Sequence, residues 1–160
     1  MSELSRRAFL AASGLAVVAR GSLVIPSTAW AAPKTGVAAP AFTASATTGK
    51  AVSLADQRGK IVVLEWTNHE CPYVLKHYET GNMQALQKEA TGQGVVWLTI
   101  ISTAPGTQGF VKAAEADQLT ASRQAAPTAV LLDPTGAVGK MYGATNTPHM
   151  YVIDKAGTLV

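Results

Sequence analysis

Residues 61–66 (IVVLEW) form a run of β-branched and other large apolar residues with the length of one β-strand. Apart from Glu65, every position in this run is apolar, so the run predicts a central strand that is covered on both faces of its sheet. Two similar runs follow at residues 95–102 (VVWLTIIS) and 128–133 (TAVLLD). A chain with strands of this kind must supply other elements to cover the sheet from both sides.

The segments between these strands have helical patterns. After Cys71 and Pro72, apolar residues recur at a spacing of three to four, with Gly81 as an expected kink. Residues 107–119 (TQGFVKAAEADQL) predict a second helix, and residues 137–144 (AVGKMYGA) predict a short helical turn. Strands and helices therefore alternate through the middle of the chain.

The segments before and after these alternating strands and helices also have patterns that predict structure. Residues 33–60 are rich in Gly, Pro, Ser and Thr and predict loops and short strands that lead into the core. Residues 149–154 (HMYVID) and 158–160 (TLV), on either side of a turn, predict a hairpin. This order of elements predicts an α/β fold with a mixed sheet that is parallel in its first part.

Charge and composition exclude some classes of protein. The 160 residues are 48% hydrophobic and 14% charged, which fits one globular domain rather than a disordered chain. The net charge is +3, but three arginines and one glutamate in the first 31 residues account for +2 of it. The remaining residues carry about +1, so the sequence shows no basic surface for a nucleic acid.

The first 31 residues predict an export signal. Arg6 and Arg7 precede a mildly apolar Ala/Gly/Val run, which resembles a bacterial twin-arginine signal. Residues 29–31 (AWA) place small residues where a signal peptidase cleaves, so we expect cleavage after Ala31. Arg20 interrupts the apolar run below the roughly 20 residues of a membrane span. The expected location is the periplasm, with no stable membrane span after cleavage.

Cys71 is the single cysteine in the sequence, although the periplasm favours disulfides. It therefore has no partner for a disulfide within these residues. Its expected place at the first turn of a helix exposes its sulfur to unsatisfied backbone N–H groups and to the positive end of the helix dipole. These favour the thiolate, which is the nucleophilic form, and Pro72 suits the first helical position. We expect a reactive or metal-ligating cysteine.

Two longer segments resemble a known family. Residues 36–72 (GVAAPAFTASATTGKAVSLADQRGKIVVLEWTNHECP) are similar to the opening of redoxin-type, AhpC/TSA-like proteins of the thioredoxin fold. Residues 133–160 (DPTGAVGKMYGATNTPHMYVIDKAGTLV) resemble the later part of the same family. The resemblance implies a thioredoxin-like domain over residues 32–160, with a mixed central sheet flanked by helices. Since the family adds a further helix after its last strand, we expect either a fragment ending at Val160 or an open apolar sheet face.

The resemblance also implies a set of site residues. Cys71 is the expected nucleophile, and Pro148 takes the place of the family's cis-proline beside it. Glu65 lies where thioredoxins have a buried carboxylate that relays protons, although a glutamate at a strand end could instead reach solvent. His69 is expected in the active-site loop, where an imidazolium would stabilise a thiolate. Further contacts to a substrate are expected from three residues: Pro72, Thr147 and His149.

The sequence departs from the family in two ways. Thioredoxins carry Cys-x-x-Cys, but here the four residues are CPYV, so Val74 occupies the place of the second cysteine. Peroxiredoxins have a threonine three residues before the cysteine and a proline seven before it, whereas this chain has Asn68 and Leu64. After residue 31 the arginines are Arg58 and Arg123, and neither is at the spacing that peroxiredoxins use.

Three functions remain open at this point. In the first, Cys71 exchanges disulfides with a partner protein, and an external thiol resolves the mixed disulfide. In the second, the protein is a one-cysteine peroxidase whose sulfenic acid an external reductant reduces. In the third, it is no enzyme but a module that holds copper or another metal through Cys71, His69 and His149. The first two need no bound cofactor, and we expect a thiol oxidoreductase or thiol-dependent peroxidase.

Overall fold

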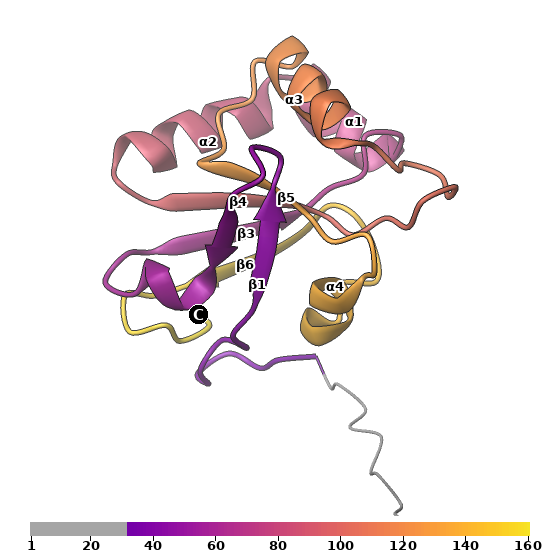
Figure 1. Cartoon of the computed structure of the whole chain (residues 1–160). Helices are drawn as coiled ribbons and strands as arrows, with labels where there is room; N and C mark the ends of the chain where they lie inside the picture. The colour runs from indigo at the N-terminus through magenta and orange to yellow at the C-terminus, as the bar shows by residue number, and fades with distance from the viewer. Residues whose placement is uncertain (1–31) are drawn as a thin grey trace, which may run out of the picture.

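A computed structural model describes residues 32–160, and the expected signal at residues 1–31 lies outside this part. A six-stranded sheet forms its centre, with the strand order β2-β1-β5-β4-β3-β6 (Figure 1). The elements are β1 (Thr43–Ala46), β2 (Ala51–Ser53), the 3-10 helix η1 (Leu54–Gln57), β3 (Val62–Trp66), α1 (Pro72–Glu79), α2 (Asn82–Gly92), β4 (Val96–Ile101), α3 (Ala113–Ser122), β5 (Ala129–Leu132), α4 (Ala137–Tyr142) and β6 (His149–Ile153).

The sheet is mixed, as the sequence predicts. Strands β3, β4 and β5 are parallel to one another, whereas β6 pairs antiparallel with β3 and β1 pairs antiparallel with β5. Every residue of β3 is buried, as expected for a strand with neighbours on both edges and cover on both faces. The register of β3 and β6 sets Trp66 opposite His149, which brings the ends of two loops together at one edge of the sheet.

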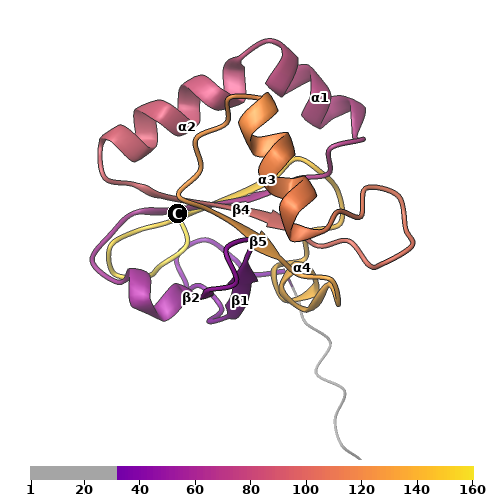
Figure 2. The same cartoon turned by 45° about the horizontal axis from the view of Figure 1, so that its top comes forward.

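Helices cover the two faces unequally. Helices α1, α2 and α3 lie on one face of the sheet, and α4 lies on the other (Figures 1 and 2). Side chains alternate along a strand, so Leu64 and Trp66 of β3 lie on the face covered by α4, whereas Val63 lies on the face covered by α1 and α2. Under α1 and α2, Val63 packs with Val74 and Tyr78, and Cys71 borders the same cluster.

Two expected helices have different bounds in the structure. The helix expected over residues 107–119 begins later, at Ala113, and ends at Ser122. Its expected first turn is a loop because Gly109 has a φ of 80°, outside the right-handed helical range. Gly81 is more than a kink, since its φ of 74° ends the first helical segment and lets a separate helix begin at Asn82.

The end of the chain forms a weaker hairpin than the sequence predicts. Residues 158–160 make two isolated bridges, from Thr158 to Ala38 and from Leu159 to Ile153, rather than a full strand. Beside this hairpin, Met150 and Val152 of β6 are exposed large apolar side chains. In the part of the chain that the structure describes, no helix is long and apolar enough to span a bilayer.

Candidate active site

The loop after β3 turns directly into helix α1. Asn68 builds the turn, because its side-chain Oδ1 accepts the backbone N–H of Glu70 at 2.9 Å and its carbonyl accepts that of Cys71 at 3.0 Å. Cys71 is the N-cap of α1, with extended backbone angles, and Pro72 is the first helical residue. The expected place of Cys71 at a helix N-terminus is confirmed.

A second loop brings Thr147 and Pro148 against the cysteine. The peptide bond between these two residues is cis, as the resemblance implies for Pro148. In the neutral form of Cys71 the Sγ–H donates to the backbone carbonyl of Thr147, with a sulfur–oxygen distance of 3.1 Å. The partly exposed thiol therefore lies between the first turn of α1 and the loop that enters β6.

The surroundings of Cys71 lower the pKa of its thiol. The largest cause is a hydrogen bond from the Thr147 side chain, which favours the thiolate. Partial burial acts in the opposite direction and raises the pKa, while the backbone N–H groups of Val74 and Tyr73 at the start of α1 lower it again. Because the net shift is downward, more of Cys71 is in the nucleophilic form near neutral pH.

Glu65 is completely buried rather than exposed at the strand end. Its two carboxylate oxygens accept hydrogen bonds from four side chains: Tyr78 Oη at 2.8 Å, Gln87 Nε2 at 3.0 Å, Trp97 Nε1 at 2.7 Å and Thr99 Oγ1 at 3.1 Å. Burial, followed by the charge of Glu65, raises the pKa of Tyr78, so this phenol stays protonated and remains a donor. The carboxylate therefore has the partners that an ionised acceptor needs in a buried site.

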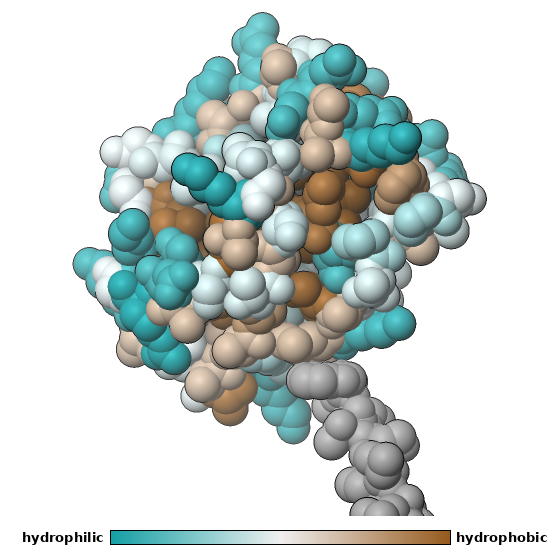
Figure 3. All heavy atoms as spheres, viewed as in Figure 1, coloured by the Kyte–Doolittle hydropathy of each residue, from teal (hydrophilic) through white to brown (hydrophobic). Residues whose placement is uncertain are grey.

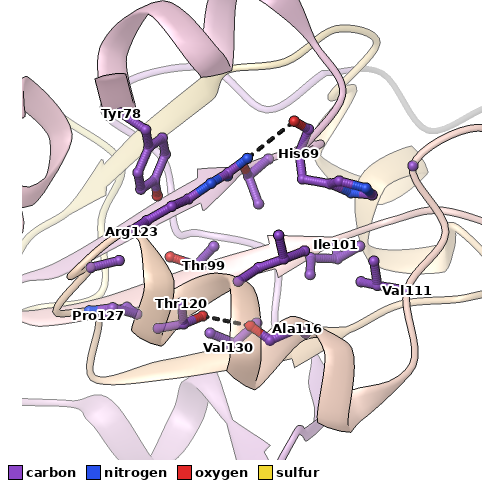
Figure 4. A pocket seen from close by; sticks show the side chains of 14 residues that line it. His69, Tyr78, Thr99, Ile101, Val111, Ala116, Thr120, Arg123, Pro127 and Val130 are labelled. Carbon is purple, nitrogen blue, oxygen red and sulfur yellow. Dashed lines mark hydrogen bonds between the residues drawn. The ribbon is translucent and has the colours of Figure 1, made fainter. Parts of the chain in front are cut away.

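The two histidines expected near Cys71 lie in different surroundings. His69 is on the loop before Cys71, and its side chain lines a pocket under α3 (Figure 4). His149 stacks on the ring of Tyr151 at a centroid distance of 5.0 Å and lies edge-on to Trp66 at 6.3 Å. Over residues 32–160, no group of three or more His, Cys, Asp and Glu side chains is arranged to hold a metal ion.

Arg123 is a neighbour of the site that the sequence does not predict. Its guanidinium donates to the backbone carbonyl of His69 at 3.1 Å and lies over the ring of Tyr78, 5.0 Å from the centroid (Figure 4). Arg123 thus connects the end of α3 to the loop that carries Cys71. It is 52 residues after the cysteine, so only the packing of α3 on the sheet brings the two together.

Comparison with protein families identifies this chain. The fold and the thiol at the start of α1, against a cis-proline, define a thioredoxin-like redox protein. The model of the AhpC/TSA family matches residues 35–160, so the chain belongs to the AhpC/TSA family. Membership of this family, together with the thiol site, makes the protein a thiol oxidoreductase or a thiol-dependent peroxidase.

Solved structures support the same fold. The exposed lipoprotein thioredoxin of Streptococcus pneumoniae is 30% identical, with a TM-score of 0.59, covering 76% of this chain and 86% of its own. A protein named as the thiol:disulfide interchange protein DsbE, from Chlorobium tepidum, is 25% identical, with a TM-score of 0.63 and coverages of 79% and 82%. A conserved protein from Geobacillus kaustophilus is similar in fold, at 23% identity and a TM-score of 0.71, over 79% of this chain and 67% of that one. A comparison with curated proteins gave no match.

Proposed function

We propose that this protein is a periplasmic thiol–disulfide exchange protein in which Cys71 is the nucleophile and an external thiol completes the reaction. The observation that carries the proposal is the position of Cys71, at the N-cap of α1 and against Thr147 and cis-Pro148, where its pKa is lowered. Val74, in the place of a second cysteine, is 1% exposed and packs in the apolar cluster under α1.

The reaction has three exchange steps. The Cys71 thiolate attacks one sulfur of a partner disulfide, a new S–S bond forms, and the other sulfur leaves as a thiolate that water protonates. An external thiolate then attacks the mixed disulfide and forms a disulfide with the partner sulfur, which releases Cys71 as a thiolate. A second external thiolate then attacks the external sulfur of that disulfide, and the partner sulfur leaves as a thiolate that water protonates. The partner is then a dithiol and the two external thiols are a disulfide, with two electrons transferred.

The surrounding residues have distinct roles in this proposal. The Thr147 hydroxyl stabilises the attacking thiolate, and the backbone beside Pro148 receives the partner chain together with Pro72 and His149. His69 belongs to the loop that orients Cys71. Glu65 acts by fixing α1 on the sheet through Tyr78, because its carboxylate oxygens are already occupied by four donors and are less suited to relay a proton.

We further propose that the chain reaches the periplasm through a twin-arginine signal at residues 1–31. Arg6, Arg7 and the cleavage motif at residues 29–31 support this location. The pneumococcal neighbour is an exposed lipoprotein, which agrees with a redox role outside the cytoplasm for proteins of this fold.

A one-cysteine peroxidase is the second candidate, because the AhpC/TSA family model covers residues 35–160. In that reaction the Cys71 thiolate attacks one peroxide oxygen, the O–O bond breaks, and the products are a sulfenic acid and an alcohol or water. An external thiol then reduces the sulfenic acid. Both candidates use the same sulfur and differ in the electrophile.

One experiment separates the two candidates. The reduced full chain is mixed in parallel with one equivalent of oxidised glutathione and one equivalent of hydrogen peroxide, and intact mass is recorded over time. We expect rapid addition of one glutathione at Cys71, its removal by added thiol, and slow reaction with peroxide. A fast gain of one oxygen with little glutathione addition would overturn the exchange proposal and favour the peroxidase. Cys71→Ser should react with neither.

A further inference from the structure

A polar cleft lies beside the loop that enters β6. The apolar hollow below α3, visible in Figure 3, has a cavity volume of about 40 Å³, which takes one or a few waters and no larger compound. The polar cleft is larger, at about 220 Å³. Its walls are the segments that follow β3 and β4 and the loop that contains Thr147. Since Thr147 also contacts the Cys71 sulfur, a protein that reacts with Cys71 comes close to this cleft.

The wall of the cleft is polar but carries no charged side chain. Seven of the nine lining residues have a hydroxyl or an amide group, and none of the nine is Asp, Glu, Lys or Arg. Hydroxyl groups both donate and accept hydrogen bonds, so the wall alone does not decide which kind of ligand fits. The groups behind the wall decide it.

Ser102 presents an oxygen that can only accept from the cleft. Its hydroxyl donates to the Asp133 carboxylate, with an Oγ–Oδ2 distance of 2.6 Å, and its Oγ accepts the indole N–H of Trp66 at 3.0 Å. The proton and one lone pair of Ser102 are thus occupied, which leaves one lone pair. Because hydrogen bonds in a chain polarise one another, the bond to a carboxylate makes Oγ a stronger acceptor. Ser102 therefore favours a donor in the cleft.

Asp133 places a negative charge behind this hydroxyl. It is 4% exposed, and its Oδ2 also accepts the backbone N–H of Gly139 in α4 at 3.0 Å. Helix α4 packs closely here, since a Cβ added at Gly139 would lie 3.0 Å from Ser102 Oγ. Within residues 32–160 no cation forms an ion pair with Asp133, because the one ion pair there joins two residues of the active-site loop. The charge of Asp133 therefore acts on the cleft without a counter-ion.

We propose that this cleft binds the ammonium group of a lysine side chain on the partner protein, beside the disulfide that Cys71 attacks. The proposal rests on the exchange reaction proposed above. An ammonium group has three donors and no acceptor, which suits Ser102 Oγ and the hydroxyl oxygens of Thr103 and Thr145. Arginine is less suited, since its planar fork pairs best with a carboxylate and no carboxylate lines the cleft. The charge of Asp133 attracts the bound cation.

Binding is measured first on the full chain with Cys71→Ser, so that no exchange contributes. The probe is Nα-acetyl-lysine amide, and NMR follows the indole N–H of Trp66, which donates to Ser102. We expect a saturable shift with a dissociation constant of about 10 mM or tighter. The Nε-acetylated compound, which lacks the charge, and Nα-acetyl-arginine amide should each bind at least about fivefold more weakly. Equal binding of the lysine compound and either control would overturn the proposal.

Two variants and a charge-matched control locate the site. Asp133→Asn keeps an acceptor oxygen for Ser102 but removes the charge, so it should weaken the lysine compound about fivefold and leave its Nε-acetylated form unchanged. Ser102→Ala removes the acceptor itself and should have a similar effect. Asp56→Asn removes the same charge from η1, which precedes β3 whereas the cleft follows it, and should change nothing. Unchanged lysine binding in a folded Asp133→Asn protein would refute the site.

The link to the reaction is tested with two short peptide disulfides that carry lysine or norleucine beside the cysteine. A lysine there speeds exchange with any thiolate, because it lowers the pKa of the leaving thiol. The ratio of the two rates is therefore compared between the unmodified protein and Asp133→Asn, in which it should be at least about threefold smaller. An unchanged ratio would overturn the assignment to a partner lysine. If Cys71 exchanged with no disulfide at all, the binding result would stand, so the two proposals fail separately.

Discussion

Two groups of Thr147 act on the Cys71 sulfur in opposite directions. The backbone carbonyl accepts the S–H of the neutral thiol, whereas the side chain stabilises the thiolate. The net shift of the Cys71 pKa is downward, because the Thr147 side chain and the backbone N–H groups of Val74 and Tyr73 outweigh partial burial. A single residue before the cis-proline thus adjusts the reactivity of the thiol through its hydroxyl.

Thr147→Val should raise the pKa of Cys71, because it removes the donor to the thiolate and keeps the size and branching of the side chain. The rate of alkylation by iodoacetamide, measured against pH, should reach its half-maximum at a higher pH than in the unmodified protein. Thr145→Val, in the same loop, is the matched control and should leave the profile in place. Coincident profiles for Thr147→Val and the unmodified protein would contradict the assigned role.

At the scale of elements, the carboxylate of Glu65 joins strands to helices. It belongs to β3 and accepts hydrogen bonds from Tyr78 of α1, Gln87 of α2 and Trp97 of β4. Gln87 in turn accepts the backbone N–H of Ala126, in the connection between α3 and β5. The position of α1, and with it the place of Cys71, therefore depends on a polar network inside the sheet–helix layer.

Glu65→Leu should lower the free energy of unfolding by at least about 3 kcal/mol, because several buried donors lose their acceptor together. Urea denaturation followed by tryptophan fluorescence measures the change. Glu89→Leu, on the exposed surface of α2, is the matched control and should change stability by less than about 0.5 kcal/mol. Similar losses in the two variants would show that the network contributes little.

The loop before α3 also supports the active-site turn. A Cβ atom at Gly109 would collide with the side chain of Asn68, which holds the backbone N–H of Glu70. Gly106 has nearly the same φ, 81° against 80°, but nothing lies within 4 Å of its added Cβ. Substitutions at both glycines would cause backbone strain, but only a substitution at Gly109 would also displace Asn68. A comparison of the two therefore distinguishes the two effects.

Gly109→Ala should lower stability by about 1 kcal/mol from strain at positive φ and should also slow alkylation of Cys71, because Asn68 is displaced. Gly106→Ala should show the loss of stability without the change in rate. Thermal unfolding and alkylation kinetics at pH 7 give the two quantities. If both variants alkylate at the rate of the unmodified protein, Asn68 does not orient the thiol.

At the scale of the whole molecule, sequence patterns predict the strands better than the site. The runs at residues 61–66, 95–102 and 128–133 became β3, β4 and β5 because buried strands need continuous apolar residues. The place of Cys71 followed from Pro72 and the helical pattern after it. Arg123 was missed, since its contact with His69, 54 residues earlier, depends on how α3 packs. The late start of α3 was missed because Gly109 ended an otherwise helical pattern.

Replacement of both Arg6 and Arg7 by lysine should keep the whole chain in the cytoplasm, because the twin-arginine route reads the pair itself and not its charge. Cell fractionation with immunodetection measures the location and shows whether the shorter, cleaved form is present. Arg20→Lys, in the same segment, is the matched control and should be exported normally. Periplasmic, cleaved protein from the double variant would refute this export route.

The site is built half on an interior strand and half on the last strand of the sheet. Cys71 follows β3, whereas Thr147 and Pro148 lead into β6, which pairs antiparallel with β3. Because the two halves of the site belong to different strands, a shift of β6 relative to β3 would change the distance between Sγ and Thr147, and with it the pKa of the thiol. The rate of amide hydrogen exchange at residues 149–153 therefore reports how often β6 separates from β3, and so how often the thiol loses its contact with Thr147.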